Sequence, residues 1–366
     1  MSAAMSAAVS AAVSEARRAF YRAIDPLGLA PLWEVLHALV PARPASAAEP
    51  ALWHWQDVRP EVLRAGELIG AAEAVRRVLI MENPGLRGQS SATGTLYAGL
   101  QLILPGEVAP SHRHSQTALR FVLEGRGAYT AVNGERHTME PGDFVITPSW
   151  TWHDHGNPGH EPVIWLDGLD IPLLRMLDAG FAENRPDAGG PATGPTTGPA
   201  SEPERPEGDA LARYGSNLRP YPEERAALAA PLFVYPYGRS RAAVLQLARS
   251  GPPHPVHGYK MQYINPTTGG AAMRTMATFL QLLPRGFTGH WYRSTDASVH
   301  SVVEGHGWIE IGESPRLRRF EWGPRDHFVV PSWQPYRIGS AAESVLFSFS
   351  DRPVHEALGI WREALT

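Results

Sequence analysis

The sequence predicts a mainly β protein in which two jelly-roll-like β-barrel domains follow an N-terminal helical arm. Residues 95–170 and 275–351 both consist of short runs rich in Val, Ile, Phe, Tyr and Trp, separated by Gly, Pro and Asn turns. Many short strands at this spacing are typical of a barrel or sandwich. The two regions also repeat each other block by block, which indicates a duplicated domain.

The composition supports a globular protein and excludes several classes of function. With 366 residues, 43% of them hydrophobic, the chain can form one large or two ordinary domains. Its net charge of −4 gives no reason to expect nucleic acid or an anionic membrane as a partner. The absence of cysteine excludes disulfides, thiolate nucleophiles and Cys-ligated metals.

The N-terminal region predicts helices, and we assign residues 1–75 to a helical arm. Its Ala-rich start lacks the basic region of a signal peptide, and no apolar run approaches the roughly 18 residues that cross a bilayer. We therefore expect a cytoplasmic protein. Apolar residues recur with helical spacing from about residue 15 to residue 39, where Pro26 and Pro31 divide the pattern into short pieces.

Three further segments follow the arm. We expect the first barrel over residues 76–184, beginning with the apolar strand "AVRRVLIMENPGL", which ends at a Pro-Gly turn. Residues 185–210 are mostly Pro, Gly, Ala, Ser, Thr and Glu, a composition that predicts a flexible linker. We expect a second barrel over residues 211–366, ending in a C-terminal helix.

The repeat provides an internal control on which residues the barrel itself needs. "LQLILPGEVAPSHRH" resembles "LQLLPRGFTGHWYR", "LRFVLEGRGAYTAVNGE" resembles "VHSVVEGHGWIEIGES", and "PGDFVITPSWTWHDHG" resembles "PRDHFVVPSWQPYRIG". The turn residues are retained in both copies, whereas most of the histidines are not. The alignment places His112 opposite His290, His114 opposite Tyr292, Arg120 opposite His300 and His153 opposite Tyr336. The histidines of the first copy therefore indicate chemistry, and the second copy is expected to bind no metal.

Three histidines of the first barrel are candidate metal ligands. His112 and His114 point to the same face of a predicted strand. His153 follows about 40 residues later, a spacing that can bring a later strand of the barrel beside the first. Three neutral imidazoles bind Zn, Fe, Cu or Ni and leave coordination positions open.

The segments "GEVAPSHRH" and "PGDFVITPSWTWHDHGN" resemble the two motifs of the cupin superfamily. The usual first motif continues to a glutamate ligand, but Ala118 and Leu119 occupy those positions here, and Glu124 lies too far along the strand. With "WLDGLDIP" in the same order, residues 15–365 apart from the linker resemble the bicupin gentisate 1,2-dioxygenases. Near relatives of that family cleave salicylate and 1-hydroxy-2-naphthoate.

This resemblance implies an extradiol-type dioxygenase that converts gentisate and O₂ to maleylpyruvate. A histidine-only shell leaves the charge of the metal uncompensated, which favours an anionic aromatic acid as the ligand. Fe(II) suits such chemistry, although zinc satisfies the same ligands. The alternatives are the same reaction on salicylate or 1-hydroxy-2-naphthoate, a metal-dependent isomerase, and a non-catalytic bicupin that binds a small aromatic acid. The resemblance also implies a homo-oligomer, most simply a tetramer.

Further residues are candidates for binding the substrate and moving protons. Arg120 shares a strand face with the histidines and can pair with a carboxylate, unless a bulge turns it outward to a surface pair. Gln101 can hydrogen-bond the substrate, although Gln281 matches it in the second copy. Only one of two adjacent arginines can point inward, and we favour Arg76 over Arg77. The remaining candidates are His155, as an acid–base group or a solvent-facing loop histidine, and Asp167, as its orienting partner or a structural turn residue.

Overall fold

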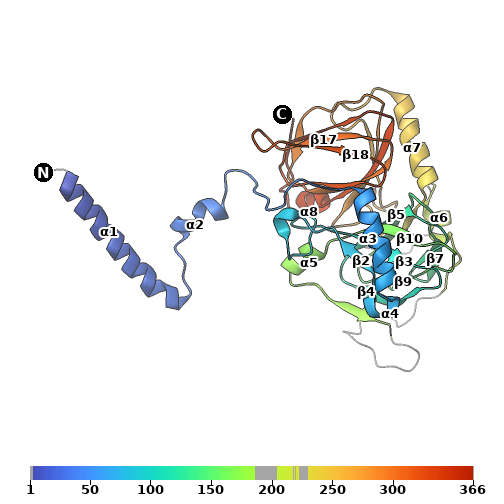
Figure 1. Ribbon diagram of the computed structural model, residues 1–366, viewed down its shortest axis with the longest axis horizontal. Coiled ribbons are helices and arrows are strands. Elements are labelled where there is room, and N and C mark those ends of the chain that lie inside the picture. Colours follow the sequence, from blue (N-terminus) through green and yellow to red (C-terminus); the bar gives the residue numbers. More distant parts are fainter. Residues whose placement is uncertain (1–2, 186–203, 217, 219, 222–229, 366) are drawn as a thin grey trace. The chain divides into compact units, whose positions relative to one another are not determined.

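The N-terminal part of the chain forms a compact unit of its own. The structure, a computed structural model, describes residues 3–185, 204–216, 218, 220–221 and 230–365, and it divides into units Met1–Ala45 and Ser46–Thr366 (Figure 1). The first unit contains α1 (Ala3–Ile24), the short 3₁₀ helix η1 (Asp25–Leu27) and α2 (Leu32–Leu39). Phe20 stacks on Trp33 with 6.4 Å between ring centroids, and the Trp33 indole donates a hydrogen bond of 2.9 Å to the Tyr21 hydroxyl. The predicted helical arm and its proline breaks are present in this unit.

The second unit begins with a connecting segment and continues into the first barrel. The connecting elements are β1 (Ala51–Trp53), α3 (Trp55–Leu68), α4 (Ala71–Ala74), β2 (Val78–Ile80) and η2 (Pro84–Leu86). The barrel consists of a six-stranded sheet of order β12-β8-β5-β10-β3-β2 and a five-stranded sheet of order β11-β4-β9-β6-β7. Its elements are β3 (Tyr97–Ile103), β4 (Val108–His114), β5 (Ala118–Glu124), β6 (Tyr129–Val132), β7 (Glu135–Thr138), β8 (Phe144–Thr147), β9 (His153–Gly156), β10 (Val163–Leu169), α5 (Ile171–Met176), β11 (Ala182–Asn184) and β12 (Val234–Tyr235).

The second barrel has the same strand order. Its sheets run β1-β19-β16-β21-β14-β13 and β22-β15-β20-β17-β18, which match the sheets of the first barrel strand for strand. Helices α6 (Asp209–Tyr214) and α7 (Tyr237–Ser250) precede it along the chain. Its remaining elements are β13 (Tyr259–Gln262), β14 (Ala277–Leu283), β15 (Tyr292–Ser294), β16 (Ser298–Glu304), β17 (Gly307–Ile311), β18 (Arg318–Trp322), β19 (His327–Val330), β20 (Tyr336–Ser340), β21 (Ser344–Ser350), α8 (Arg352–Ala357) and β22 (Glu363–Leu365). The predicted duplication is therefore present in the topology.

The two barrels exchange edge strands. Strand β1, which precedes the first barrel in the sequence, pairs with β19 of the second barrel. Strand β12, which follows the predicted linker, pairs with β8 of the first barrel. The boundaries we placed at residues 76, 184 and 211 remain predictions, because most of the linker lies outside the described residues and these two strands cross them.

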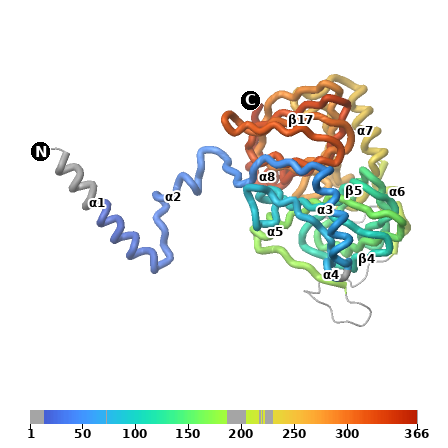
Figure 2. Tube along the Cα trace, in the orientation of Figure 1, coloured from blue at the N-terminus to red at the C-terminus, as the bar shows by residue number. Residues whose placement is uncertain are grey.

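A continuous hydrophobic core joins the barrels. Phe121 of β5 stacks on Phe347 of β21 with ring centroids 4.2 Å apart, and Phe144 lies 5.3 Å from the same ring. All three side chains are fully buried, as is Phe349 beside them. The tube in Figure 2 follows the chain from the cyan and green first barrel to the orange and red second barrel. No helix among the described residues is both long and apolar enough to span a bilayer.

Candidate metal centre

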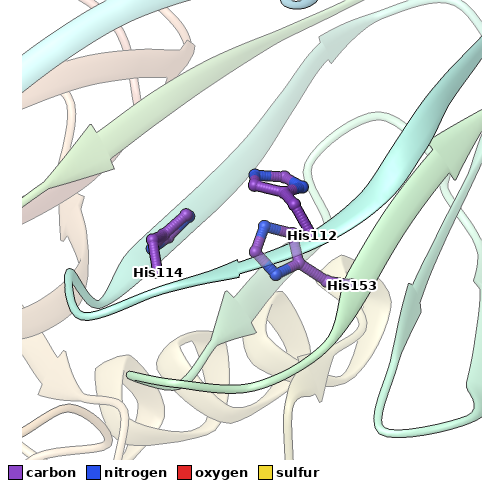
Figure 3. Close-up of side chains that lie close together, drawn as sticks. All are labelled: His112, His114 and His153. Atoms are coloured by element: carbon purple, nitrogen blue, oxygen red, sulfur yellow. The ribbon is translucent and has the colours of Figure 1, made fainter. Parts of the chain in front are cut away.

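The three candidate ligands lie together on two neighbouring strands of the first barrel. His112 and His114 are on β4, and His153 begins β9, where it pairs with His112 across the antiparallel ladder. The rings of His112 and His153 are 4.1 Å apart, and those of His114 and His153 are 4.8 Å apart (Figure 3). One nitrogen from each of the three rings lies within 4.8 Å of the others. This spacing is suited to a single metal ion.

Hydrogen bonds to the backbone orient two of these rings. The Nδ1 atoms of His114 and His153 lie 2.8 Å from the carbonyl oxygens of Gln116 and Thr151, respectively. Because a carbonyl can only accept, each Nδ1 carries the proton and each Nε2 keeps its lone pair. The Nε2 of His153 is buried and has no hydrogen-bond partner among the described residues. A metal ion would satisfy this atom, so the residues fit the proposed metal.

Burial keeps the three imidazoles neutral, which is the form that binds metal. Burial lowers the pKa of His114 to about 4. Burial also lowers the pKa of His112 to about 2, with a further contribution from the nearby Arg76 charge. The pKa of His153 lies well below its ordinary value for the same reason.

A buried ion pair holds the ligand strand from its opposite face, and no pattern in the sequence indicated it. Arg113 lies between the two β4 histidines and points away from them, where its guanidinium donates to Glu183 of β11 at 2.8 Å. The indole rings of Trp150 and Trp152 lie 4.5 and 4.6 Å from the Arg113 guanidinium carbon. Strand β4 is therefore fixed between β9 and β11.

The structure distinguishes the two adjacent arginines. An Arg76 Nη2 lies 2.5 Å from the Nδ1 of His112 and donates to the Pro110 carbonyl at 2.8 Å. Arg77 turns away and forms a buried ion pair of 2.7 Å with Glu107. Gln101 is buried on β3 and, together with both arginines, lines a small cavity of about 20 Å³. Of the two arginines, Arg76 is the one beside the candidate metal ligands.

Arg120 and Asp167 form a buried row with Gly99 across three strands. The ladders place Asp167 of β10 opposite Gly99 of β3 on one side and Arg120 of β5 on the other. The Arg120 Nε lies 3.8 Å from an Asp167 carboxylate oxygen, too far for a hydrogen bond, and this Nε has no hydrogen-bond partner among the described residues. The same guanidinium donates to the Thr147 hydroxyl. The alternative in which Arg120 turns outward to a surface pair is therefore wrong.

The pKa of the Asp167 carboxyl is higher than that of an ordinary aspartate. Burial raises its pKa to about 6, although the nearby Arg120 charge and a hydrogen bond of 2.9 Å from the Trp165 indole both oppose this shift. Because Asp167 lies within β10, its alternative assignment as a turn residue is wrong.

His155 is buried on strand β9. Its exposed fraction is 1%, so the alternative of a solvent-facing loop histidine is wrong. Its ring lies 5.7 Å from the rings of both His153 and Trp165, and its Nδ1 has no hydrogen-bond partner among the described residues. Burial holds the pKa of His155 well below its ordinary value. Glu124, which the sequence excluded as a ligand, instead pairs with Arg59 of α3 at 2.6 Å.

The strand register corrects our alignment of the second copy. Tyr292 lies opposite Tyr336 as His112 lies opposite His153. The Ser294 carbonyl accepts from the Trp333 backbone at 2.7 Å, as the His114 carbonyl accepts from Trp150 at 2.8 Å. Tyr292 and Ser294 therefore correspond to His112 and His114, and the exposed His290 does not correspond to a ligand. Our alignment matched histidine to histidine, whereas counting back from the shared Glu-Gly turn gives the structural correspondence.

Comparisons with known proteins agree with this fold. The family described as "Cupin domain" matches residues 99–169. The chain is 51% identical to gentisate 1,2 dioxygenase 1 of Aquipseudomonas alcaligenes, over 95% of this chain and 96% of the relative. It is 39% identical to a gentisate 1,2-dioxygenase of Streptomyces sp, over 93% of each chain. A crystal structure of salicylate 1,2-dioxygenase from Pseudoaminobacter salicylatoxidans with gentisate superposes with a TM-score of 0.84 at 33% identity, covering 95% of this chain and 93% of that one.

These similarities extend over nearly the whole of both chains. They include both barrels, and the first barrel contains the three-histidine cluster. This protein is therefore a bicupin dioxygenase and belongs to the gentisate 1,2-dioxygenase family.

Proposed function

We propose that this ring-cleaving dioxygenase acts on gentisate (2,5-dihydroxybenzoate) and O₂ at an Fe(II) ion bound by His112, His114 and His153, and releases maleylpyruvate. The observation that carries the proposal is the combination of three neutral imidazoles with a buried arginine that keeps a donor free. The identity of 51% to a gentisate 1,2-dioxygenase supports this substrate.

The ligand set suits an anionic chelating substrate. Three imidazoles contribute no negative charge, so the full charge of a divalent ion is left for the substrate to neutralise. When bound, Fe(II) supplies the redox chemistry that couples an electron-rich ring to O₂. The three histidines leave open the coordination positions that a carboxylate and a neighbouring phenolic oxygen can occupy.

Two arginines are placed to orient the substrate carboxylate. Arg120 is buried with its Nε free, and a planar guanidinium recognises a carboxylate through paired hydrogen bonds. Arg76 lies against His112 and supplies a second positive charge at the same end of the site. Gln101 is buried on β3, the strand that pairs with β2, and can hydrogen-bond a substrate oxygen. These residues fix the ring in one orientation.

His155 and Asp167 are placed to manage the protons of the ring hydroxyls. His155 is neutral and its Nδ1 has no partner among the described residues, so it can accept or donate a hydrogen bond. Asp167 has a pKa of about 6 and therefore exchanges protons near neutral pH. The hydroxyl at position 5, which salicylate lacks, enriches the ring in electrons.

The second candidate is the same reaction on salicylate or 1-hydroxy-2-naphthoate. It is supported by the likeness to a salicylate 1,2-dioxygenase structure over 95% of this chain. Gly99 lies opposite Asp167 on β3 and places no side chain there. An added Cβ would lie 2.6 Å from a Val78 methyl carbon and 2.9 Å from the Tyr97 hydroxyl, so a larger residue at this position would have to displace them. The isomerase and the non-catalytic bicupin are not supported, because the curated relatives of matching length are dioxygenases.

Oxygen uptake tests the proposed reaction directly. The protein is loaded anaerobically with Fe(II), its metal content is measured, and gentisate, salicylate and 1-hydroxy-2-naphthoate are added in turn under an oxygen electrode. We expect one O₂ consumed per gentisate, with maleylpyruvate detected by its absorbance, and no uptake by protein loaded with Zn(II). Iron-loaded protein that consumes no O₂ with gentisate would contradict the proposal.

We also propose that the chain assembles as a homotetramer through its N-terminal unit. Helix α2 exposes Leu32, Trp33, Leu36 and Leu39, with exposed fractions between 41% and 65%. Apolar side chains in such numbers need a covering surface. Light scattering of the full chain and of a Leu32→Ser/Leu36→Ser variant is expected to give a tetramer and a smaller species, and a monomeric wild type would contradict this proposal. The cytoplasmic location stays a prediction.

A further inference from the structure

The second barrel contains a cavity at the place where the first barrel has its candidate metal centre. The cavity has a volume of about 270 Å³. Tyr292, Ser294 and Tyr336 line it, and these are the structural counterparts of His112, His114 and His153. Where the first barrel has its three candidate metal ligands, the second barrel therefore has a cavity lined by two tyrosines and a serine.

A single ammonium group lies in this cavity. Lys260 of β13 is the only lysine in the sequence, and every other long cationic side chain is an arginine. Its Nζ lies 4.4 Å from the centroid of the Phe279 ring. Among the described residues it has no hydrogen bond and no ion pair. Lys260 is partly buried, and the Asp296 carboxylate acts on it only from beyond ion-pair distance, so the ammonium can still pair with an anion that enters from outside the chain.

Neutral polar groups line the cavity around Lys260. Ser348 corresponds to Asp167 of the first barrel, since it faces His300 as Asp167 faces Arg120. The Ser348 hydroxyl is buried and has no hydrogen-bond partner among the described residues. The Tyr336 hydroxyl likewise forms no hydrogen bond there. Both groups can donate to a carboxylate oxygen.

Besides the two tyrosines, three other titratable groups line the cavity, namely Asp296, Arg352 and His257. The Asp296 carboxylate accepts a hydrogen bond of 3.0 Å from the Trp361 indole and is not within ion-pair distance of Lys260. Arg352 stacks on Trp361 at 4.0 Å and pairs with Glu356, so its charge is already compensated. His257 is neutral, because burial lowers its pKa to about 2. Lys260 is therefore the cation of the cavity that no carboxylate pairs with among the described residues, and Asp296 is its acidic group.

We propose that the second barrel binds a small organic acid in this cavity without a metal, with the carboxylate at Lys260 and a hydroxyl or amine of the ligand at Asp296. The aromatic side chains of Phe279, Tyr292 and Tyr336 provide flat apolar walls for the body of the ligand. Lys260 supplies the positive charge that the metal is proposed to supply in the first barrel. The proposal stands independently of which acid the first barrel cleaves.

The choice of lysine at this position agrees with the proposal. Burial lowers the pKa of Lys260 to about 8, while the Asp296 charge opposes that shift, so the ammonium form predominates at neutral pH. An ammonium is a compact charge with freely directed donors, whereas a guanidinium needs a wider planar space. A bound carboxylate would compensate the ammonium directly.

Binding of 4-hydroxybenzoate to the iron-loaded protein tests this site. The probe has a carboxylate and a hydroxyl at opposite ends, and it lacks the neighbouring hydroxyl needed to chelate a metal. Isothermal titration calorimetry compares the wild type with Lys260→Met, which keeps the side-chain length, and with Arg76→Met, which removes a cation from the first barrel instead. Besides any binding at the first barrel, we expect a site for one probe per chain that R76M retains and that is at least tenfold weaker in K260M.

Any other pattern overturns the proposal. Equal binding by K260M, loss of binding in R76M, or no binding at millimolar concentrations would each do so. K260M is expected to cleave gentisate as the wild type does, which shows that it is folded. A second measurement uses the wild type alone: because an amine-reactive reagent can modify only Lys260 and the N-terminus, mass spectrometry can follow whether 4-hydroxybenzoate protects Lys260. Unchanged modification of Lys260 at saturating probe would also overturn the proposal.

Discussion

At the scale of single residues, the first barrel concentrates charge where water is excluded. Arg120 is buried with a free Nε, Asp167 is buried without a hydrogen bond to it, and His155 is buried and neutral. Charged groups in such places are costly to the fold, and sites of ligand binding and catalysis are where this cost is commonly met. Each of these residues can be changed with a specific expected result.

Replacing Arg120 by lysine is expected to weaken substrate binding more than it slows the reaction. A hydrogen bond to a charged group contributes about 1.5–3 kcal/mol, so losing the paired geometry should raise the KM for gentisate roughly tenfold or more. Steady-state oxygen uptake measures this change. Arg126→Lys, at an exposed arginine of the same barrel, is the matched control. An unchanged KM in R120K would rule out Arg120 as the carboxylate partner.

Protonation of Asp167 is expected to lower kcat/KM at acidic pH. Because its pKa is raised to about 6, the carboxyl takes up its proton at a higher pH than an ordinary aspartate. The ionised fraction, and with it the charge that faces Arg120, falls as the pH drops through about 6. We expect kcat/KM to decline across that range in the wild type and to stay flatter in Asp167→Asn. Iron content is measured at each pH as a control. The same decline of kcat/KM with falling pH in both proteins would disprove this role.

Parity and spacing sufficed to predict most of the candidate site at this scale. His112 and His114 are alternate residues of β4, and His153 follows at the expected distance. The shared strand face that we expected for Arg120 is wrong, because Arg120 lies on β5, a strand of the other sheet, although its charge still acts on His112. The environment of each residue could not be predicted, because it depends on groups far along the chain, such as Thr147 beside Arg120. Lys260 was missed altogether, since an isolated lysine carries no motif.

At the scale of elements, strand β4 is the part of the first barrel on which the metal ligands depend. It pairs with β9 on one side and with β11 on the other, and Arg113 connects it to Glu183 through a buried ion pair. The sequence predicted β4 from its alternation. It could not predict β11 or its counterpart β22, because three residues are too few to show a period and their pairing is decided by tertiary contacts.

Breaking this ion pair is expected to destabilise the barrel. Glu183→Gln leaves the Arg113 charge buried without its counter-ion, which costs about 3–5 kcal/mol in the free energy of unfolding. Urea denaturation followed by circular dichroism measures it. The control is Glu140→Gln, which removes an exposed ion pair with Arg126 and should change stability by no more than about 0.5 kcal/mol. Equal stabilities of E183Q and E140Q would refute the role given to this pair.

At the scale of the whole molecule, the unit Ser46–Thr366 holds two barrels that share one core. Phe121 and Phe144 of the first barrel pack on Phe347 of the second, and each barrel receives an edge strand from outside its own sequence block. The sequence predicted the duplication from three repeated blocks. It could not predict the exchange of β1 and β12, because these strands of two or three residues carry no pattern that names their partner.

The shared core is expected to make the two barrels unfold together. Phe347→Ala removes a fully buried ring from the boundary, which costs about 3–5 kcal/mol. Circular dichroism and tryptophan fluorescence should both report one transition, displaced by the same amount. Leu358→Ala, at a side chain that is 67% exposed, should leave it unchanged. Two separated transitions, with only one displaced in F347A, would show that the barrels are independent.

The reciprocal placement of β1 and β12 also bears on how a gene for such a chain can change over generations. A break between the two halves would leave β8 without β12 and β19 without β1. Each new edge would present unpaired backbone groups, which invite aggregation. One half can therefore differ at its ligand positions, as the second barrel does with Tyr292, Ser294 and Tyr336, but neither half can be passed on without exposing an unpaired edge strand.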